Sequence, residues 1–170
     1  MDLLLLLLYA PSKSNKMNEP VIGMTRLQKE LFLIQKLLQD KGIKYKYPFM
    51  PFNLGPFSKD LCRDIEWLKH ENVIKEKIVE SRYKGICRIY KLTKKGLRRA
   101  TQLLTNHKIV NEIYPLIKEV KKQYNDMDIV SLVELTHNLF PEYVKKLTGW
   151  SEMKNVNFLL KEILVEITNF

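Results

Sequence analysis

Apolar residues recur at helical spacing in two stretches near the start of the chain. Residues 2–10 contain an unbroken leucine run, which predicts a helix buried on all sides, with Asp2 at its start and Pro11 after its end. In residues 26–39 the apolar positions lie three or four residues apart, and Thr25 is the expected N-cap. The pattern therefore predicts two helices, the first of them central to the core.

The following segments predict a third helix and a β-hairpin. Ser58 is the expected N-cap of a helix over residues 59–70, whose apolar residues again form one stripe. Residues 73–79 and 86–92 are rich in β-branched and aromatic side chains, and the polar residues 80–85 between them predict a turn. The order helix, helix, helix, hairpin is typical of a winged helix-turn-helix domain, with the third helix as recognition helix and the hairpin as wing.

The rest of the chain is predicted to be helical. Helices are expected over residues 94–104, 108–124, 128–140 and 151–168, and Pro115 is expected to interrupt the second of these. The predicted fold is therefore mainly α with a small β-hairpin.

Two parts of this fold are expected to have different roles. Residues 1–105 would form the winged-helix domain and residues 106–170 a C-terminal helical extension. The last predicted helix has a broad apolar face that would complete the core or form the seam of a homodimer. We expect a homodimer, with a dimerisation face that consists of Val156, Leu160, Ile163, Leu164 and Ile167.

Residues 45–57 differ in character from the helical segments around them. They contain five aromatic residues and three prolines, which exclude a regular helix or a central strand. This segment is interpreted as a long loop that its aromatic side chains pack onto the domain. A partner or ligand surface is the other interpretation.

The positive charge is concentrated in the middle of the chain. Residues 41–100 carry 16 basic and six acidic side chains, whereas residues 1–40 have a net charge of +1 and residues 101–170 of −1. A local basic block indicates a polyanionic partner, for which duplex DNA is the first hypothesis. The expected DNA contacts lie on the third helix, the wing and its flank: Lys59, Arg63, Arg82, Lys84, Arg88, Lys91, Lys94 and Lys95.

The composition of this block favours attraction to the DNA backbone over reading of bases. Lysine outnumbers arginine 23 to 6, and lysine acts as a point charge where arginine makes bidentate contacts with guanine. The third helix and the residue after it also contain Asp60, Asp64, Glu66 and Glu71, of which Asp60 and Asp64 lie beside Lys59 and Arg63 and would repel phosphates. Because of these acidic residues, a protein-interaction module on the same scaffold remains the alternative to a DNA-binding regulator.

Three motifs in residues 25–96 resemble a known family. They are Thr25–Lys29 (TRLQK), Asn53–Ser58 (NLGPFS) and Tyr90–Gly96 (YKLTKKG). They resemble the uncharacterised YwgA-like proteins of bacteria and archaea and, more distantly, the SocA-like (Panacea) antitoxin domain, which shares a Gly-Pro step ahead of a helix. The resemblance implies a regulatory or antitoxin-like role and offers no catalytic residues.

Signals of catalysis, metal binding or membrane insertion are lacking in the sequence. His70, His107 and His137 have no Cys or carboxylate at metal-ligand spacing, and no glycine-rich phosphate loop occurs. We therefore expect no enzyme, no cofactor and no metal. Cys62 and Cys87 are interpreted as buried free thiols of a cytoplasmic protein. The leucine run is too short to span a membrane, and the expected function is transcriptional regulation, with an antitoxin-like or adaptor protein as the alternative.

Overall fold

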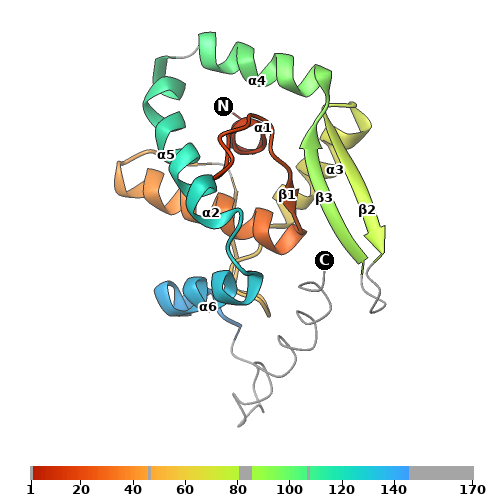
Figure 1. The fold of residues 1–170 in the computed structure, drawn as a ribbon. Coiled ribbons are helices and arrows are strands. Elements are labelled where there is room, and N and C mark those ends of the chain that lie inside the picture. The colour runs from red at the N-terminus through yellow and green to blue at the C-terminus, as the bar shows by residue number, and fades with distance from the viewer. Residues whose placement is uncertain (1, 46, 81–85, 107, 146–170) are drawn as a thin grey trace.

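The computed structural model describes residues 2–45, 47–80, 86–106 and 108–145 (Figure 1). These residues form a mainly helical fold with a small antiparallel sheet, which agrees with the predicted fold class at this level. The elements in chain order are α1 (Leu3–Tyr9), β1 (Val21–Ile22), α2 (Met24–Asp40), α3 (Lys59–His70), β2 (Ile74–Glu80), β3 (Ile86–Leu92), α4 (Lys94–Asn106), α5 (Lys108–Tyr124), α6 (Ile129–Leu139) and the short 3-10 helix η1 (Pro141–Tyr143).

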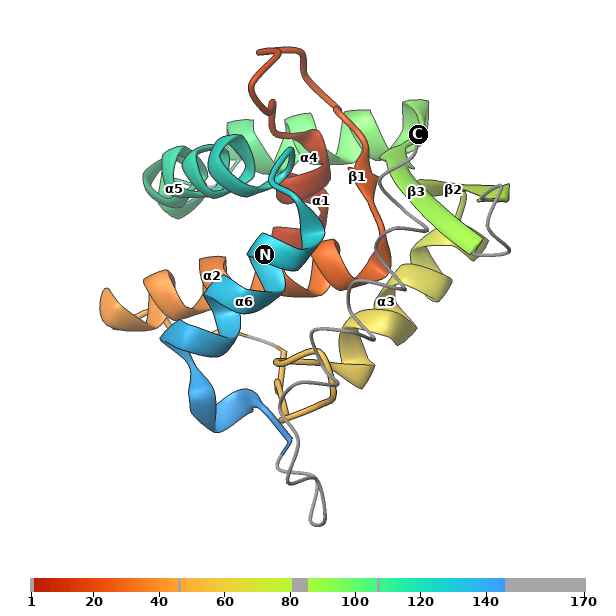
Figure 2. The same ribbon diagram turned by 60° about the horizontal axis from the view of Figure 1, so that its bottom comes forward.

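Helix α1 is the centre of the core. All six leucines of Leu3–Leu8 are 0% exposed, as the unbroken apolar run predicts. The Asp2 side chain caps the helix by accepting a hydrogen bond from the Leu5 amide at 3.3 Å. Figure 1 shows α1 almost end-on, with α2, α4 and α5 packed around it, and in the turned view of Figure 2 α1 lies between α4 and α2. Three helices and strand β3 thus pack against a short helix whose six leucines are all buried.

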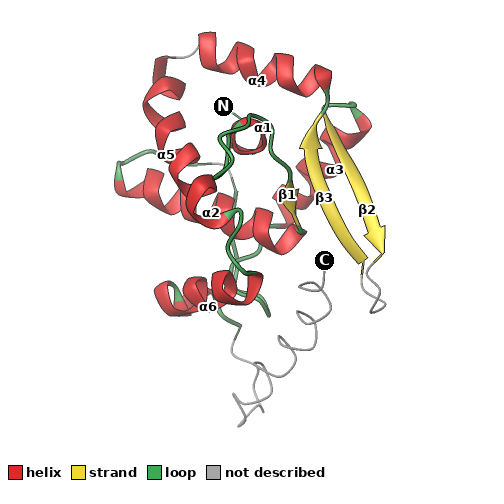
Figure 3. Cartoon of the chain, in the orientation of Figure 1, coloured by secondary structure: helices red, strands yellow, loops and turns green. Residues whose placement is uncertain are grey.

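The sheet has three strands in the order β1-β3-β2, all antiparallel (Figure 3). Strands β2 and β3 form the predicted hairpin, and β1 pairs with the other edge of β3, with Val21 opposite Tyr90. Strand β1 was not predicted because two residues are too few to show an alternating pattern. Its pairing ties the segment between α1 and α2 to the hairpin.

The N-cap of α3 was predicted correctly, but that of α2 was not. Ser58 caps α3, since its hydroxyl accepts a hydrogen bond from the Leu61 amide at 3.4 Å. Helix α2 begins at Met24 with Gly23 as N-cap, so Thr25 lies inside the helix. Gly23 has φ +93°, and its amide donates to the Arg88 carbonyl of β3 at 2.8 Å. The sheet therefore sets this helix start, at a backbone conformation that favours glycine.

The interruption expected at Pro115 does not occur. Helix α5 continues through this residue from Lys108 to Tyr124. A proline inside a helix costs about 3 kcal/mol, and burial of one side of α5 against α1 and α2 offsets that cost. The buried stripe consists of Val110, Ile113, Ile117 and Val120.

Residues 41–58 form a long connection between α2 and α3. Met50 and Phe57 exchange two backbone hydrogen bonds, of 2.9 and 3.0 Å, which fold the segment back on itself. Tyr47 is only 3% exposed and Tyr45 and Phe49 pack against the core, as predicted, but Phe52 is 44% exposed. This connection departs from the three- or four-residue turn of a helix-turn-helix.

Two basic side chains are buried in the helical half of the molecule. Lys29 is 2% exposed, and its ammonium donates to the Pro56 carbonyl at 3.2 Å. Lys121 is 0% exposed and donates to the carbonyls of Leu8 and Glu19 at 3.2 and 2.7 Å. Both lysines thus join separate segments of the chain through backbone oxygens.

The predicted helix over residues 151–168, and with it the dimerisation face, lies outside the described residues. Within the part of the chain that the structure describes, no helix combines the length and the hydropathy that a bilayer crossing requires. The same part brings no three His, Cys, Asp or Glu side chains together as a possible metal site.

Candidate nucleic-acid interface

The β2–β3 hairpin has one face toward the core. Successive side chains of a strand point to opposite faces, and the antiparallel register places Ile74 opposite Leu92 and Glu76 opposite Tyr90. Ile74, Tyr90 and Leu92 are at most 2% exposed. These residues define the inner face of the hairpin.

The outer face of the hairpin carries three lysines. Lys75 lies directly opposite Lys91, and Lys77 follows on the same face two residues further along β2. Lys75 and Lys77 are exposed and Lys91 is half-buried. None of the three forms an ion pair with any described residue. Because like charges directly opposite each other destabilise a sheet, this cluster is suited to an external anion.

The start of α4 adds four further cations next to the hairpin, which differ in their contacts. Lys94 and Arg98 are exposed and form no ion pair among the described residues. Lys95 instead donates to the Glu71 carbonyl at 2.8 Å and lies 3.4 Å from its carboxylate. The Arg99 guanidinium lies over the Trp67 ring at 6.0 Å. Two of the four cations are thus directed toward α3 rather than toward solvent.

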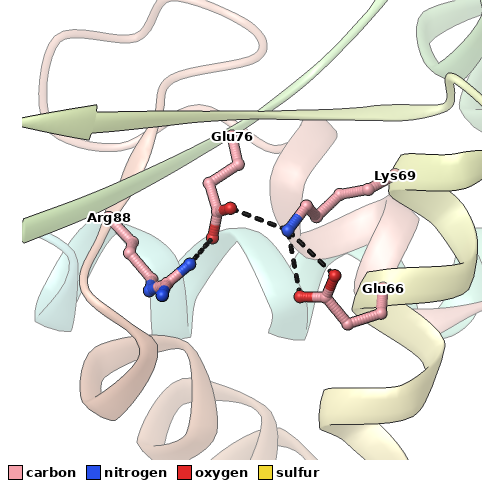
Figure 4. A network of polar contacts seen from close by, with 4 residues as sticks. All are labelled: Glu66, Lys69, Glu76 and Arg88. Carbon is pink, nitrogen blue, oxygen red and sulfur yellow. Dashed lines mark hydrogen bonds and ion pairs between the residues drawn. The ribbon is translucent and has the colours of Figure 1, made fainter.

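Arg88 lies on the inner face, away from the three lysines. Its guanidinium contacts one carboxylate oxygen of Glu76 at 3.0 Å, and the Lys69 ammonium contacts the other at 2.7 Å (Figure 4). Lys69 also donates to both carboxylate oxygens of Glu66 at 3.0 Å. Burial alone would raise the pKa of Glu76, but the hydrogen bonds from Lys69 and Arg88 outweigh it and lower that pKa. Glu76 is therefore ionised at neutral pH and holds Arg88 in place.

Helix α3 presents a mixed surface. Lys59 in its first turn is exposed and makes no ion pair with a described residue. Arg63 is also exposed, but its guanidinium is bonded to Asp60 one turn earlier in the same helix. Trp67 on the same helix has 54% of its surface exposed. This helix thus offers little net positive charge to a phosphate backbone.

The structure separates the cations that the sequence grouped together. Lys91 lies on the outer face and Lys94 is exposed at the start of α4, whereas Arg88 and Lys95 bind carboxylates of this chain. The predicted contacts Arg82 and Lys84 lie outside the described residues.

The sequence prediction did not include Lys75, Lys77 and Arg98 among the contact residues. The two-residue alternation along β2 and β3 was a sufficient signal for Lys75 and Lys77, because it places both on one face with Lys91. No comparable pattern marks Arg98, whose exposure depends on how α4 packs.

Comparison with known proteins adds no support to the hairpin face as a binding surface, which rests on the geometry alone. No protein-family model matches the chain, and no curated protein matches it. The resemblance to the YwgA-like and SocA-like families thus stays a prediction from the motifs.

Proposed function

We propose that this protein is a winged-helix transcriptional regulator that binds duplex DNA mainly through the outer face of its hairpin. The observation that carries the proposal is the cluster of Lys75, Lys77 and Lys91, which has no anion within the described chain although two of its members face each other. Phosphate groups spaced along a DNA backbone supply such an anion, and a protruding hairpin can follow them.

The topology supports the winged-helix part of the proposal. The order α1, β1, α2, α3, β2, β3, with β3 between the other two strands, suits a helical domain that ends in a wing. The long connection over residues 41–58 is its departure from a helix-turn-helix. Together with the Arg63–Asp60 pair on α3, this departure favours a wing-dominated mode of binding with little reading of bases.

A salt titration with two matched variants tests this proposal. The triple variant Lys75→Gln/Lys77→Gln/Lys91→Gln should flatten the slope of log K against log salt by roughly 2.7, since each phosphate contact contributes about 0.9. The control Lys13→Gln/Lys44→Gln/Lys122→Gln removes the same charge from exposed positions outside the hairpin and should keep the wild-type slope.

Two results would contradict the proposal. Absence of duplex binding by the wild-type protein at ~50 mM salt would exclude the DNA-binding function. Equal slopes for the two triple variants would show that the hairpin face is not the contact surface. In either case the lysine cluster would need another explanation.

A protein-interaction module of the antitoxin or adaptor type is the second candidate. The observation that favours it is the exposed indole of Trp67 on a helix with four acidic side chains in or next to it, because aromatic residues often anchor protein interfaces. Under this alternative, Trp67→Ala would abolish capture of a partner protein while the lysine variants would not.

The homodimer is also part of the proposal, on the apolar pattern of residues 156–167. Light scattering should give twice the monomer mass for the wild-type protein. Leu160→Glu with Leu164→Glu should give a monomer that remains folded. A wild-type monomer would assign these residues to the core instead.

A further inference from the structure

Apolar packing holds only the base of the hairpin. On the inner face, Ile74 and Leu92 near the base are 2% exposed, whereas Ile78 and Ile86 further out are 55% and 68% exposed. Strand β1 supports only two residues of β3, next to Tyr90 and Ile89. The outer half of the wing therefore has no hydrophobic contact that would fix its direction among the described residues.

Glu76 lies at the boundary between these two halves. It follows the buried Ile74 by two residues on the same face, opposite Tyr90, and its side chain is 8% exposed. One carboxylate oxygen binds Lys69 of α3 and the other binds Arg88 of β3 (Figure 4). Through this single carboxylate, α3 and both strands of the hairpin are joined beyond the point where apolar packing ends.

We propose that Glu76 positions the wing relative to α3 and that duplex binding therefore requires this acidic side chain. The inference rests on the proposed function, because it deepens the account of the same binding surface. Glu76 itself touches no DNA. It acts through Lys69 and Arg88, by keeping the outer-face lysines at a fixed angle to the recognition helix.

Simple electrostatics predicts the opposite effect, which makes the proposal testable. Removing a negative charge near a DNA-binding surface raises the local positive potential and should tighten binding. It would also release Arg88 and Lys69 to contact phosphates. If Glu76 only restrains those cations, its removal strengthens binding; if it positions the wing, its removal weakens binding.

The experiment compares four variants in the same ion-pair network. Glu76→Gln and Glu66→Gln each raise the net charge by one, and Glu76→Asp and Glu66→Asp each leave it unchanged. Glu66 is the matched control because its side chain is 64% exposed and, among the described residues, its one ion pair is with Lys69, three residues away in the same helix. Aspartate is about 1.5 Å shorter than glutamate, so at position 76 it keeps the charge and loses the double contact.

Both Glu76 variants should bind duplex DNA roughly tenfold more weakly than the wild-type protein, the equivalent of about 1.4 kcal/mol. Both Glu66 variants should stay within about twofold of the wild type, since an exposed pair within one helix contributes little. Binding by Glu76→Gln that equals or exceeds binding by Glu66→Gln would overturn the proposal.

Hydrogen exchange supplies a readout that does not depend on DNA. In the Glu76 variants the amides of β2 and β3 should exchange at least threefold faster, whereas amides of α1 should keep their wild-type protection. If wild-type protein binds no duplex, the proposed function fails, and unchanged hairpin exchange in Glu76→Gln would separately overturn the positioning role.

Lys69→Gln is the second route if both Glu76 variants fail to fold. It cuts the link to α3 and leaves the Glu76–Arg88 pair intact within the hairpin. Its control is Lys122→Gln, an equal charge change at an exposed position of α5. Weaker duplex binding and faster hairpin exchange than in the control would support the proposal, and equality with the control would overturn it.

Discussion

The lysines of the hairpin and the lysines of the helical half differ in their exposure and in their partners. Lys75 and Lys77 are exposed on the outer face of β2 and have no anionic partner in the described chain. Lys29 and Lys121 are 2% and 0% exposed and donate to backbone carbonyls. The exposed pair is available to a ligand, whereas each buried lysine joins two segments of the chain inside the fold.

The difference shows what decides the role of a lysine in this fold. Burial lowers the pKa of Lys29 to about 7, and it also lowers the pKa of Lys121, which lies near the buried carboxylate of Glu30. Lys75 and Lys77 are instead exposed on the hairpin, where a phosphate group can reach them. The net charge of +10 therefore overstates the positive charge that is exposed at the surface. The hairpin supplies a larger share of this exposed charge than of the formal total.

The largest expected effect is that of Lys121→Met on stability. The substitution removes two hydrogen bonds to backbone carbonyls and one of the two cations, Lys121 and Arg26, that act on the buried Glu30. We expect the free energy of unfolding to fall by about 3 kcal/mol, measured by urea denaturation. Lys122→Met, at the exposed neighbouring position, should change it by less than about 0.5 kcal/mol. Equal losses in the two variants would remove the distinction between buried and exposed lysines.

Lys29→Met should raise stability, because Lys29 has no carboxylate partner among the described residues and bears the cost of burial. We expect a gain of about 2 kcal/mol at pH 7. Its folded pKa of about 7 lies below the unfolded value of 10.5, so the cost is absent above pH 10.5 and grows as the pH falls toward 7. The wild-type unfolding free energy should therefore rise between pH 7 and 10.

Denaturation curves of the Lys29→Met variant over that pH range provide the measurement. The variant should lack the part of the rise that Lys29 causes, and its duplex affinity should equal that of the wild type. Lys13→Met is the exposed control and should retain the full rise. A variant curve parallel to that of the wild type would mean that Lys29 is charged and solvated in the folded protein.

On the hairpin, Lys75→Glu should stabilise the fold and weaken duplex binding at the same time. A glutamate opposite Lys91 replaces a repulsion with an attraction, worth about 0.5 kcal/mol. Lys77→Glu is the matched control, because it makes the same charge change opposite the apolar Ile89. Both variants should lose DNA affinity in a fluorescence titration, and only Lys75→Glu should gain stability. A loss of stability in Lys75→Glu would contradict the repulsion between Lys75 and Lys91.

The smallest effect is expected for Asp60→Asn, which frees Arg63 on α3. The pair lies three residues apart in one exposed helix, so its loss should cost less than about 0.5 kcal/mol. Duplex affinity should rise by about twofold if Arg63 then reaches a phosphate. Glu119→Gln, an equal charge change at an exposed position of α5, should leave affinity unchanged. A tenfold gain would give α3 a larger share of binding than the wing-dominated mode allows.

Local signals gave the elements whose causes are local. The Ser58 cap and the apolar stripe after it were sufficient to place α3, and the β-rich runs were sufficient to place the hairpin. The start of α2 and the continuity of α5 through Pro115 were predicted wrongly, because contacts with distant segments decide both. Strand β1 exists only through its pairing with β3, which no pattern of two residues can indicate.

The sequence was sufficient to predict which region of the chain carries the candidate site, but not which of its cations face solvent. The charge block identified the hairpin, yet the sequence does not show that Arg88 and Lys95 are neutralised by Glu76 and Glu71. The burial of Lys29 was equally hidden, because its acceptor is a backbone carbonyl 27 positions away. Charge counting measures how many cations exist, whereas packing determines how many of them face solvent.

The leucine-rich helix α1 has a consequence for the order in which this protein folds during synthesis. Its partners in α4 and α5 lie about one hundred residues downstream, and ribosomes add roughly 5–20 residues per second. The six contiguous leucines thus stay uncovered for on the order of ten seconds, until α4 and α5 have been synthesised. During that interval the nascent chain exposes an apolar segment that chaperones can bind. The folding yield in the cell should therefore depend on chaperones more strongly than the stability of the folded protein does.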